Sequence, residues 1–90
     1  MARVTFTAHL SRYFPALADR EVEAASVAEL VRALDRAHPG LASYLVDERG
    51  RLRQHVNVFV DGRAVRDRER LADSLTGDAR VFVAQALSGG

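Results

Sequence analysis

The chain contains no cysteine, no lysine and no tryptophan among its 90 residues. Without cysteine, the chain has no disulfide bonds, no thiolate catalysis and no cysteine-based zinc sites. The N-terminus does not show the charged and then apolar pattern of a signal peptide, so we expect a cytoplasmic protein. No apolar run reaches about 18 residues, which excludes a transmembrane helix, and we expect no contact with a membrane.

Charge is nearly balanced, but the basic residues are all of one kind. The 13 basic residues are all arginine and the acidic residues number 12, for a net charge of +1. A nucleic-acid-binding surface needs a clustered basic face, so this balance argues against a nucleic-acid partner. Hydrophobic residues make up 48% and charged residues 28% of the chain, as in a single small globular domain.

Alternating apolar and polar residues predict a first strand over residues 3–10. Residues 11–15 interrupt this pattern, because Pro15 cannot donate a hydrogen bond to a strand ladder. A weaker alternation predicts a second strand over residues 20–24. The short connection between the two strands favours an antiparallel hairpin.

A single long helix is predicted over residues 26–38. Ser26 and Glu29 have the spacing of a capping box, in which each side chain satisfies a backbone N–H at the helix start. Pro39 and Gly40 end the helix. The apolar residues recur at helical spacing and form one stripe: Val27, Leu30, Val31 and Leu34.

The second half of the chain contains mostly strand signals. Residues 41–46 predict a short helical turn that closes one end of the core, and residues 47–50 an exposed loop. Residues 53–60 predict a strand with three valines on one face, and Asp61-Gly62 is a tight-turn signal before a short strand over residues 63–65. The last predicted strand covers residues 80–87.

This order of elements predicts an α+β protein with a β-grasp fold. One helix covers only one face of a mixed four- to five-stranded sheet, so the other face is left open to solvent or a partner. The first and last strands pair in parallel at the centre of the sheet. We expect the β-grasp domain to span residues 1–87, followed by a flexible Ser-Gly-Gly tail over residues 88–90.

The usual constellations of catalytic residues are missing. The histidines His9, His38 and His55 lie far apart without ligand spacing, and the sequence has no nucleophile elbow, phosphate loop or dinucleotide-binding glycine motif. We therefore expect no metal site, no bound cofactor and no enzymatic activity of the chain itself.

The candidate reactive group is the carboxylate of Gly90, because Gly89 and Gly90 have no side chain and suit a narrow channel in another protein. The alternative is an inert tail or a linker remnant.

Four segments together resemble the MoaD/ThiS family of ubiquitin-like sulfur carriers, which includes the small subunit of molybdopterin synthase. They are the helix entry at residues 26–30, the strand and turn at residues 55–62, the Leu71…Leu75 pair leading into the last strand, and the terminal Ser88-Gly89-Gly90. The resemblance implies that an activating enzyme uses ATP and Mg²⁺ to adenylate Gly90. A sulfur donor then displaces AMP and leaves a thiocarboxylate for an acceptor synthase subunit.

The resemblance leaves four sulfur pathways open: molybdopterin, thiamine, cysteine and tRNA thiolation. The 90-residue length favours the molybdopterin and cysteine carriers over the shorter thiamine carriers. Two alternatives to the sulfur-carrier function are also open. The chain could serve as a ubiquitin-like modifier conjugated through Gly90, or as a non-catalytic interaction domain. We expect a monomer when no partner is bound.

Partner proteins need a surface, and the alternation predicts one. If Val81 and Val83 face the helix, then Phe82 lies on the open face of the sheet. The valines of the strand over residues 53–60 likewise face the core, which places Phe59 on the open face as well. Exposed aromatic area of this kind marks binding sites. The predicted partner-binding residues are this patch and the base of the tail: Phe59, Phe82, Ala84, Leu87 and Ser88. The alternative is that the loop at Tyr13 and Phe14 folds over the patch.

Overall fold

The structure is a computed structural model that describes residues 1–85. It contains five strands and three helices in these residues. In chain order they are β1 (Ala2–Phe6), α1 (Ala8–Ser11), β2 (Arg20–Val22), α2 (Val27–Ala37), α3 (Leu41–Leu45), β3 (Val56–Val60), β4 (Arg63–Ala64) and β5 (Arg80–Gln85). No helix of the described residues is long and apolar enough to cross a membrane.

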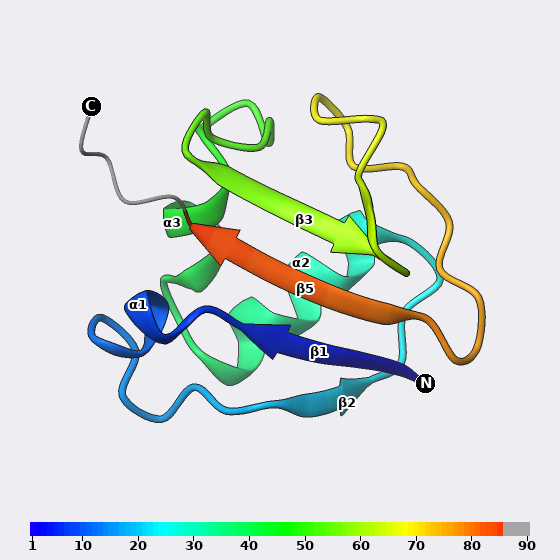
Figure 1. Ribbon diagram of the computed structural model, residues 1–90. Coiled ribbons are helices and arrows are strands. Elements are labelled where there is room, and N and C mark those ends of the chain that lie inside the picture. The colour runs from blue at the N-terminus through cyan, green and yellow to red at the C-terminus, as the bar shows by residue number, and fades with distance from the viewer. Residues whose placement is uncertain (86–90) are drawn as a thin grey trace.

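The strands form one mixed sheet in the order β2-β1-β5-β3-β4 (Figure 1). The central pair, β1 and β5, is parallel, and every other pair is antiparallel. Helix α2 crosses one face of this sheet and leaves the opposite face without a helix (Figure 1). The predicted architecture of a mixed sheet with one main helix on one face is therefore confirmed.

The core lies between the sheet and the helices. Its largest side chains are less than 2% exposed and come from every layer: Leu10, Leu30, Leu34, Leu41, Leu45, Val4, Val27, Val56, Val58, Val81 and Val83. Burial of each such side chain contributes about 1.5–3 kcal/mol to folding. Because alternate residues of β3 and β5 supply these valines, the residues between them must face the other side of the sheet.

The predicted start of the main helix is confirmed. Ser26 is the N-cap of α2, and its Oγ accepts a hydrogen bond from Glu29 N at 3.2 Å. The reciprocal bond from the Glu29 carboxylate is not among the hydrogen bonds of residues 1–85. Instead, Val27 N donates to Asp73 O and Ala28 N donates to Leu71 O. These two contacts satisfy N–H groups that a helix start leaves without partners.

The turn between β3 and β4 also forms as predicted. Asp61 and Gly62 both have positive φ, 50° and 85°, as a two-residue type I′ turn requires. The Asp61 side chain accepts a hydrogen bond from Arg80 N at 2.9 Å, which fastens this turn to the start of β5.

Several predicted strand ends are wrong. Strand β1 ends at Phe6, because the chain turns into α1 after Thr7, whose N–H still donates to Val83 O of β5. That helical turn buries Leu10 completely. Over only four residues, an apolar residue at every second position does not distinguish a helical turn from a strand. Strand β3 begins at Val56, because Val56 N donates to the carbonyl of Arg53 in a turn.

The remaining strands are shorter than the predicted ranges. Strand β2 covers residues 20–22, and β4 covers residues 63–64. Strand β5 is described to Gln85, and the last two residues of its predicted range lie outside the described residues. The short helical turn predicted over residues 41–46 is confirmed as α3.

Candidate functional site

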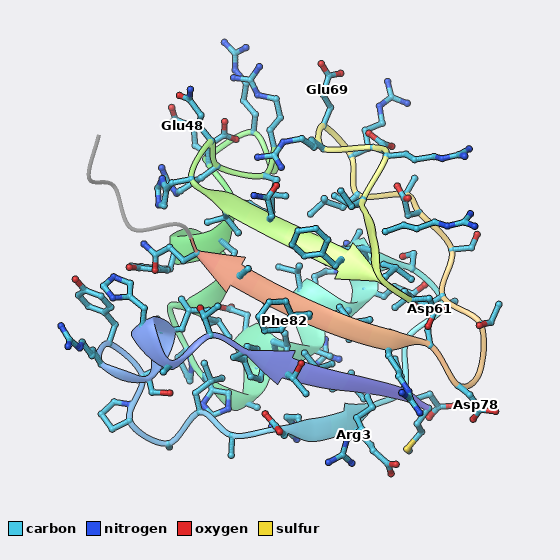
Figure 2. The ribbon with its side chains drawn as sticks, viewed as in Figure 1. Arg3, Glu48, Asp61, Glu69, Asp78 and Phe82 are labelled. Atoms are coloured by element: carbon cyan, nitrogen blue, oxygen red, sulfur yellow. The ribbon has the colours of Figure 1, made fainter. Side chains whose placement is uncertain are left out.

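Two phenylalanines lie side by side on the open face of the sheet. Phe59 of β3 and Phe82 of β5 are directly paired across the antiparallel strands. Their ring centroids are 6.3 Å apart and their planes differ by 29°, a stacked arrangement. Phe82 is 39% exposed, and Figure 2 shows it on the side of the sheet away from α2. The predicted aromatic patch is therefore present.

The patch borders a hollow of about 640 Å³. Its apolar part is formed by the two phenylalanines, and its basic part by Arg3 of β1 and Arg80 of β5. Both arginines are exposed, and neither forms an ion pair with residues 1–85. A hollow of this composition suits an apolar side chain flanked by carboxylates, because the arginines complement negative charge at the rim.

The loop that was the alternative cover for the patch packs elsewhere. The Tyr13 ring lies 5.2 Å from the Tyr44 ring, and the Phe14 ring lies 5.8 Å from it. Ala84 is half-buried and pairs with Asn57 next to the patch. The remaining predicted site residues lie outside the described residues: Leu87, Ser88, Gly89 and Gly90.

Gln85, the last described residue, is bound by the side chains of Tyr44 in α3 and of Thr7, which lies between β1 and α1. Tyr44 of α3 donates a hydrogen bond from its hydroxyl to Gln85 Oε1 at 2.8 Å. The Gln85 backbone N–H donates to Thr7 Oγ1 at 3.4 Å, and Val56 of β3 is its strand partner. Sequence reasoning missed these contacts, because no local pattern links residues that lie 41 and 78 positions apart.

A protein-family model matches the sequence of this chain and assigns the chain to a family. The ThiS family model matches residues 4–90, which is nearly the whole chain. The chain belongs to the ThiS family. Members of this family are ubiquitin-like sulfur carriers and modifiers, small carrier proteins rather than catalysts. The resemblance drawn from the four sequence segments is thus confirmed at the level of the family.

Relatives of this ThiS-family protein agree with the fold. It is 33% identical over 66 residues to small archaeal modifier protein 3 of Haloferax volcanii, a match that covers 73% of this chain and 71% of that protein. A chain in the Amycolatopsis orientalis BexX/CysO complex superposes with a TM-score of 0.85 at 22% identity, over 100% of both chains. SAMP1 from Haloferax volcanii superposes with a TM-score of 0.77 at 25% identity, over 99% of this chain and 98% of that chain.

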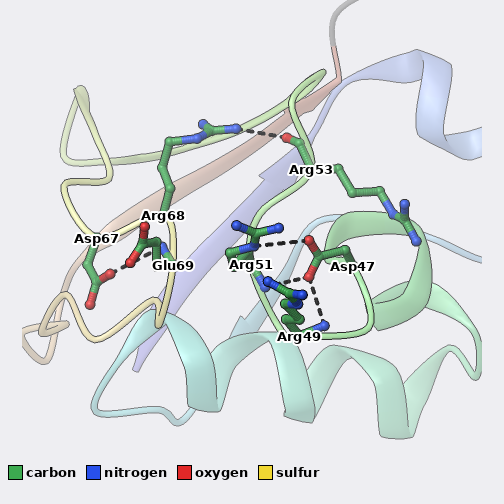
Figure 3. A network of polar contacts seen from close by, with 7 residues as sticks. All are labelled: Asp47, Arg49, Arg51, Arg53, Asp67, Arg68 and Glu69. Atoms are coloured by element: carbon green, nitrogen blue, oxygen red, sulfur yellow. Dashed lines mark hydrogen bonds and ion pairs between the residues drawn. The ribbon is translucent and has the colours of Figure 1, made fainter.

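The ThiS-family protein also has a polar network in two loops beside β3 (Figure 3). In residues 47–53, Asp47 accepts hydrogen bonds from Arg51 N and Arg49 N and pairs with the Arg51 side chain at 3.3 Å. The backbone N–H of Arg51 is the main reason that the pKa of Asp47 is lowered, although desolvation opposes it. No group of three metal-binding side chains is present in residues 1–85.

Arg68 joins the two loops. Its guanidinium donates to Asn57 Oδ1, to Arg53 O and to Val56 O at 2.8–2.9 Å. The carbonyls of Arg53 and Val56 belong to the turn before β3 and to its first residue. The network therefore ties this end of the strand to residues 66–70.

Proposed function

We propose that this protein is a sulfur carrier and that Gly90 is its reactive residue. The observation that carries the proposal is that the ThiS family match continues through the terminal Gly89-Gly90. A carboxylate oxygen of Gly90 attacks the α-phosphorus of Mg²⁺-bound ATP on a partner activating enzyme, and pyrophosphate leaves. Hydrosulfide from a sulfur donor then attacks the acyl carbon, AMP leaves, a proton is released, and a thiocarboxylate remains.

Each step answers a chemical need. A carboxylate is a poor electrophile, and the mixed anhydride with AMP gives it a good leaving group. The thiocarboxylate is a strong nucleophile that attacks the substrate bound to an acceptor synthase subunit, and water later restores the carboxylate. Two glycines without side chains let this group pass through a narrow channel. ATP and Mg²⁺ belong to the partner, and we place these steps in the cytoplasm.

We propose further that the partner enzymes bind the carrier at the hollow beside Phe59 and Phe82. The apolar rings and the two arginines at its rim support this assignment. Strand β5 carries Phe82, and Gln85 follows three residues later, about 10 Å along the strand. A partner bound to the patch would therefore meet the chain close to the start of its last five residues.

The test is the intact mass of the protein coexpressed with each candidate activating enzyme and a sulfur donor. We expect a heavier species in which one sulfur replaces one oxygen, mapped to Gly90. Gly90→Ala should lose this species. Gly77→Ala is the matched control, because a methyl group there meets no atom within 4 Å. A chain that stays unmodified with every activating enzyme of its organism would refute the proposal.

A ubiquitin-like modifier is the second candidate, favoured by the similarity to a small archaeal modifier protein. Conjugation would join Gly90 to lysines of other proteins, because this chain has no lysine. Arg80 is its last trypsin site, so digestion would leave residues 81–90 attached to each modified lysine. That remnant on cellular proteins would favour the modifier, and its absence beside a loaded thiocarboxylate would favour the carrier.

A further inference from the structure

Two side chains from other parts of the fold bind Gln85, the last described residue of β5. Strand β1 stops at Phe6, so beyond Val83 the backbone of β5 has no regular partner on that side. Side chains take over there: Thr7 Oγ1 accepts from Gln85 N, and the Tyr44 hydroxyl donates to Gln85 Oε1. Backbone groups without a regular strand partner usually open readily to water. These contacts oppose such opening at Gln85.

Tyr44 is itself held in place by the core. It belongs to α3, whose Leu41 and Leu45 are 0% exposed. The rings of Tyr13 and Phe14 pack against its ring from the first loop. A ring fixed on these sides leaves its hydroxyl little freedom, so the hydrogen bond to Gln85 is formed before any partner binds.

We propose that Tyr44 is a positioning residue for carrier loading, an inference that rests on the proposed function. By holding Gln85, it fixes the point from which residues 86–90 begin. Five residues reach at most about 17 Å when fully extended. The reactive centre of a partner must therefore lie within that distance of Gln85. Without the hydrogen bond, the end of β5 is less ordered, and that order must be restored in each loading reaction.

The test compares Tyr44→Phe with Tyr13→Phe. The first variant keeps the ring packing and removes only the hydroxyl that binds Gln85. The second removes the hydroxyl of a neighbouring ring in the same cluster, and Tyr13 is 57% exposed. Amide hydrogen exchange at Gln85 reports the order of the strand end with no partner present. We expect exchange about 2- to 10-fold faster in Tyr44→Phe, as the loss of one hydrogen bond implies, and unchanged in Tyr13→Phe.

The second readout is carrier-dependent pyrophosphate release by the activating enzyme that loads the wild-type chain. We expect Tyr44→Phe to lower kcat about 2- to 10-fold and to leave KM for the carrier unchanged, because the surface at Phe59 and Phe82 is intact. Equal kcat for both variants, or equal exchange at Gln85, would overturn the positioning role. A wild-type chain that no enzyme loads would instead refute the proposed function.

Discussion

Replacing Arg68 with alanine tests whether the polar loops stabilise the fold. Arg68 is half-buried, and its guanidinium makes three hydrogen bonds across two loops. The bonds to Asn57 and to the Val56 carbonyl are partly buried, and the bond to the Arg53 carbonyl is exposed. In the variant, water replaces the guanidinium only partly at the two partly buried acceptors. The start of β3 then loses its tie to residues 66–70.

The expected cost follows from those contacts. Each of the two partly buried bonds contributes about 1 kcal/mol net, and the exposed one little. Arg68→Ala should therefore lower the free energy of unfolding by about 2 kcal/mol. For a chain of this size, that corresponds to a fall in Tm of roughly 10 °C. Arg70→Ala is the matched control, because Arg70 is an exposed arginine of the same loop, and its loss should cost no more than about 0.5 kcal/mol.

The assay is urea unfolding followed by circular dichroism for the wild type and both variants. A lower midpoint with an unchanged slope for Arg68→Ala would show a loss of stability without a change in the surface exposed on unfolding. Arg68→Lys should recover only part of the loss, because an ammonium group lacks the planar fork that reaches three acceptors. Equal midpoints for Arg68→Ala and Arg70→Ala would refute the reasoning.

Three further predictions concern other parts of the fold. Ser26→Ala should destabilise the protein by about 1 kcal/mol in thermal unfolding, because Glu29 N loses its acceptor. Gly62→Ala should cost about 1 kcal/mol, because φ is +85° in that turn, whereas a similar cost for Gly77→Ala would contradict this explanation. Backbone N–H groups, that of Arg70 foremost, lower the pKa of Asp67 below its ordinary value of 3.8. The folded state thus favours the ionised form of Asp67. Its contribution to the free energy of unfolding is therefore fully present above about pH 4 and is lost as the pH falls through the pKa of the folded state. In Asp67→Asn, the free energy of unfolding should fall less steeply at acid pH than in the wild type. An unchanged pH dependence would exclude this effect.

The two parts of the molecule to which we assign functions in our proposals lie on one strand. Val81 and Val83 bury one side of β5 in the core, and this fixes Phe82 on the open face. Gln85, three residues later, is where Tyr44 and Thr7 bind. A substitution in the buried side of β5 would thus disturb both the patch and the last described residue, whereas Tyr44→Phe separates them.

The features that depend on near neighbours along the chain could be predicted from the sequence. Ser26 caps a helix through an N–H three residues away, and Asp61-Gly62 turns the chain because glycine readily adopts positive φ. The alternation of valines in the two long strands placed the phenylalanines on the open face, because side chains of a strand alternate between its faces. The terminal Gly89-Gly90 and the family resemblance likewise needed no structure.

The residues at which the strands begin and end, and the contacts that hold them there, depend on tertiary packing. Strand β1 stops at Phe6 because the chain turns into α1 after Thr7 N donates to Val83 O, an arrangement that a local alternation does not contain. The contacts of Tyr44 with Gln85 and of Arg68 with Asn57 join residues 41 and 11 positions apart. Such pairs meet only after the sheet and helices have packed, so no periodic pattern along the chain records them.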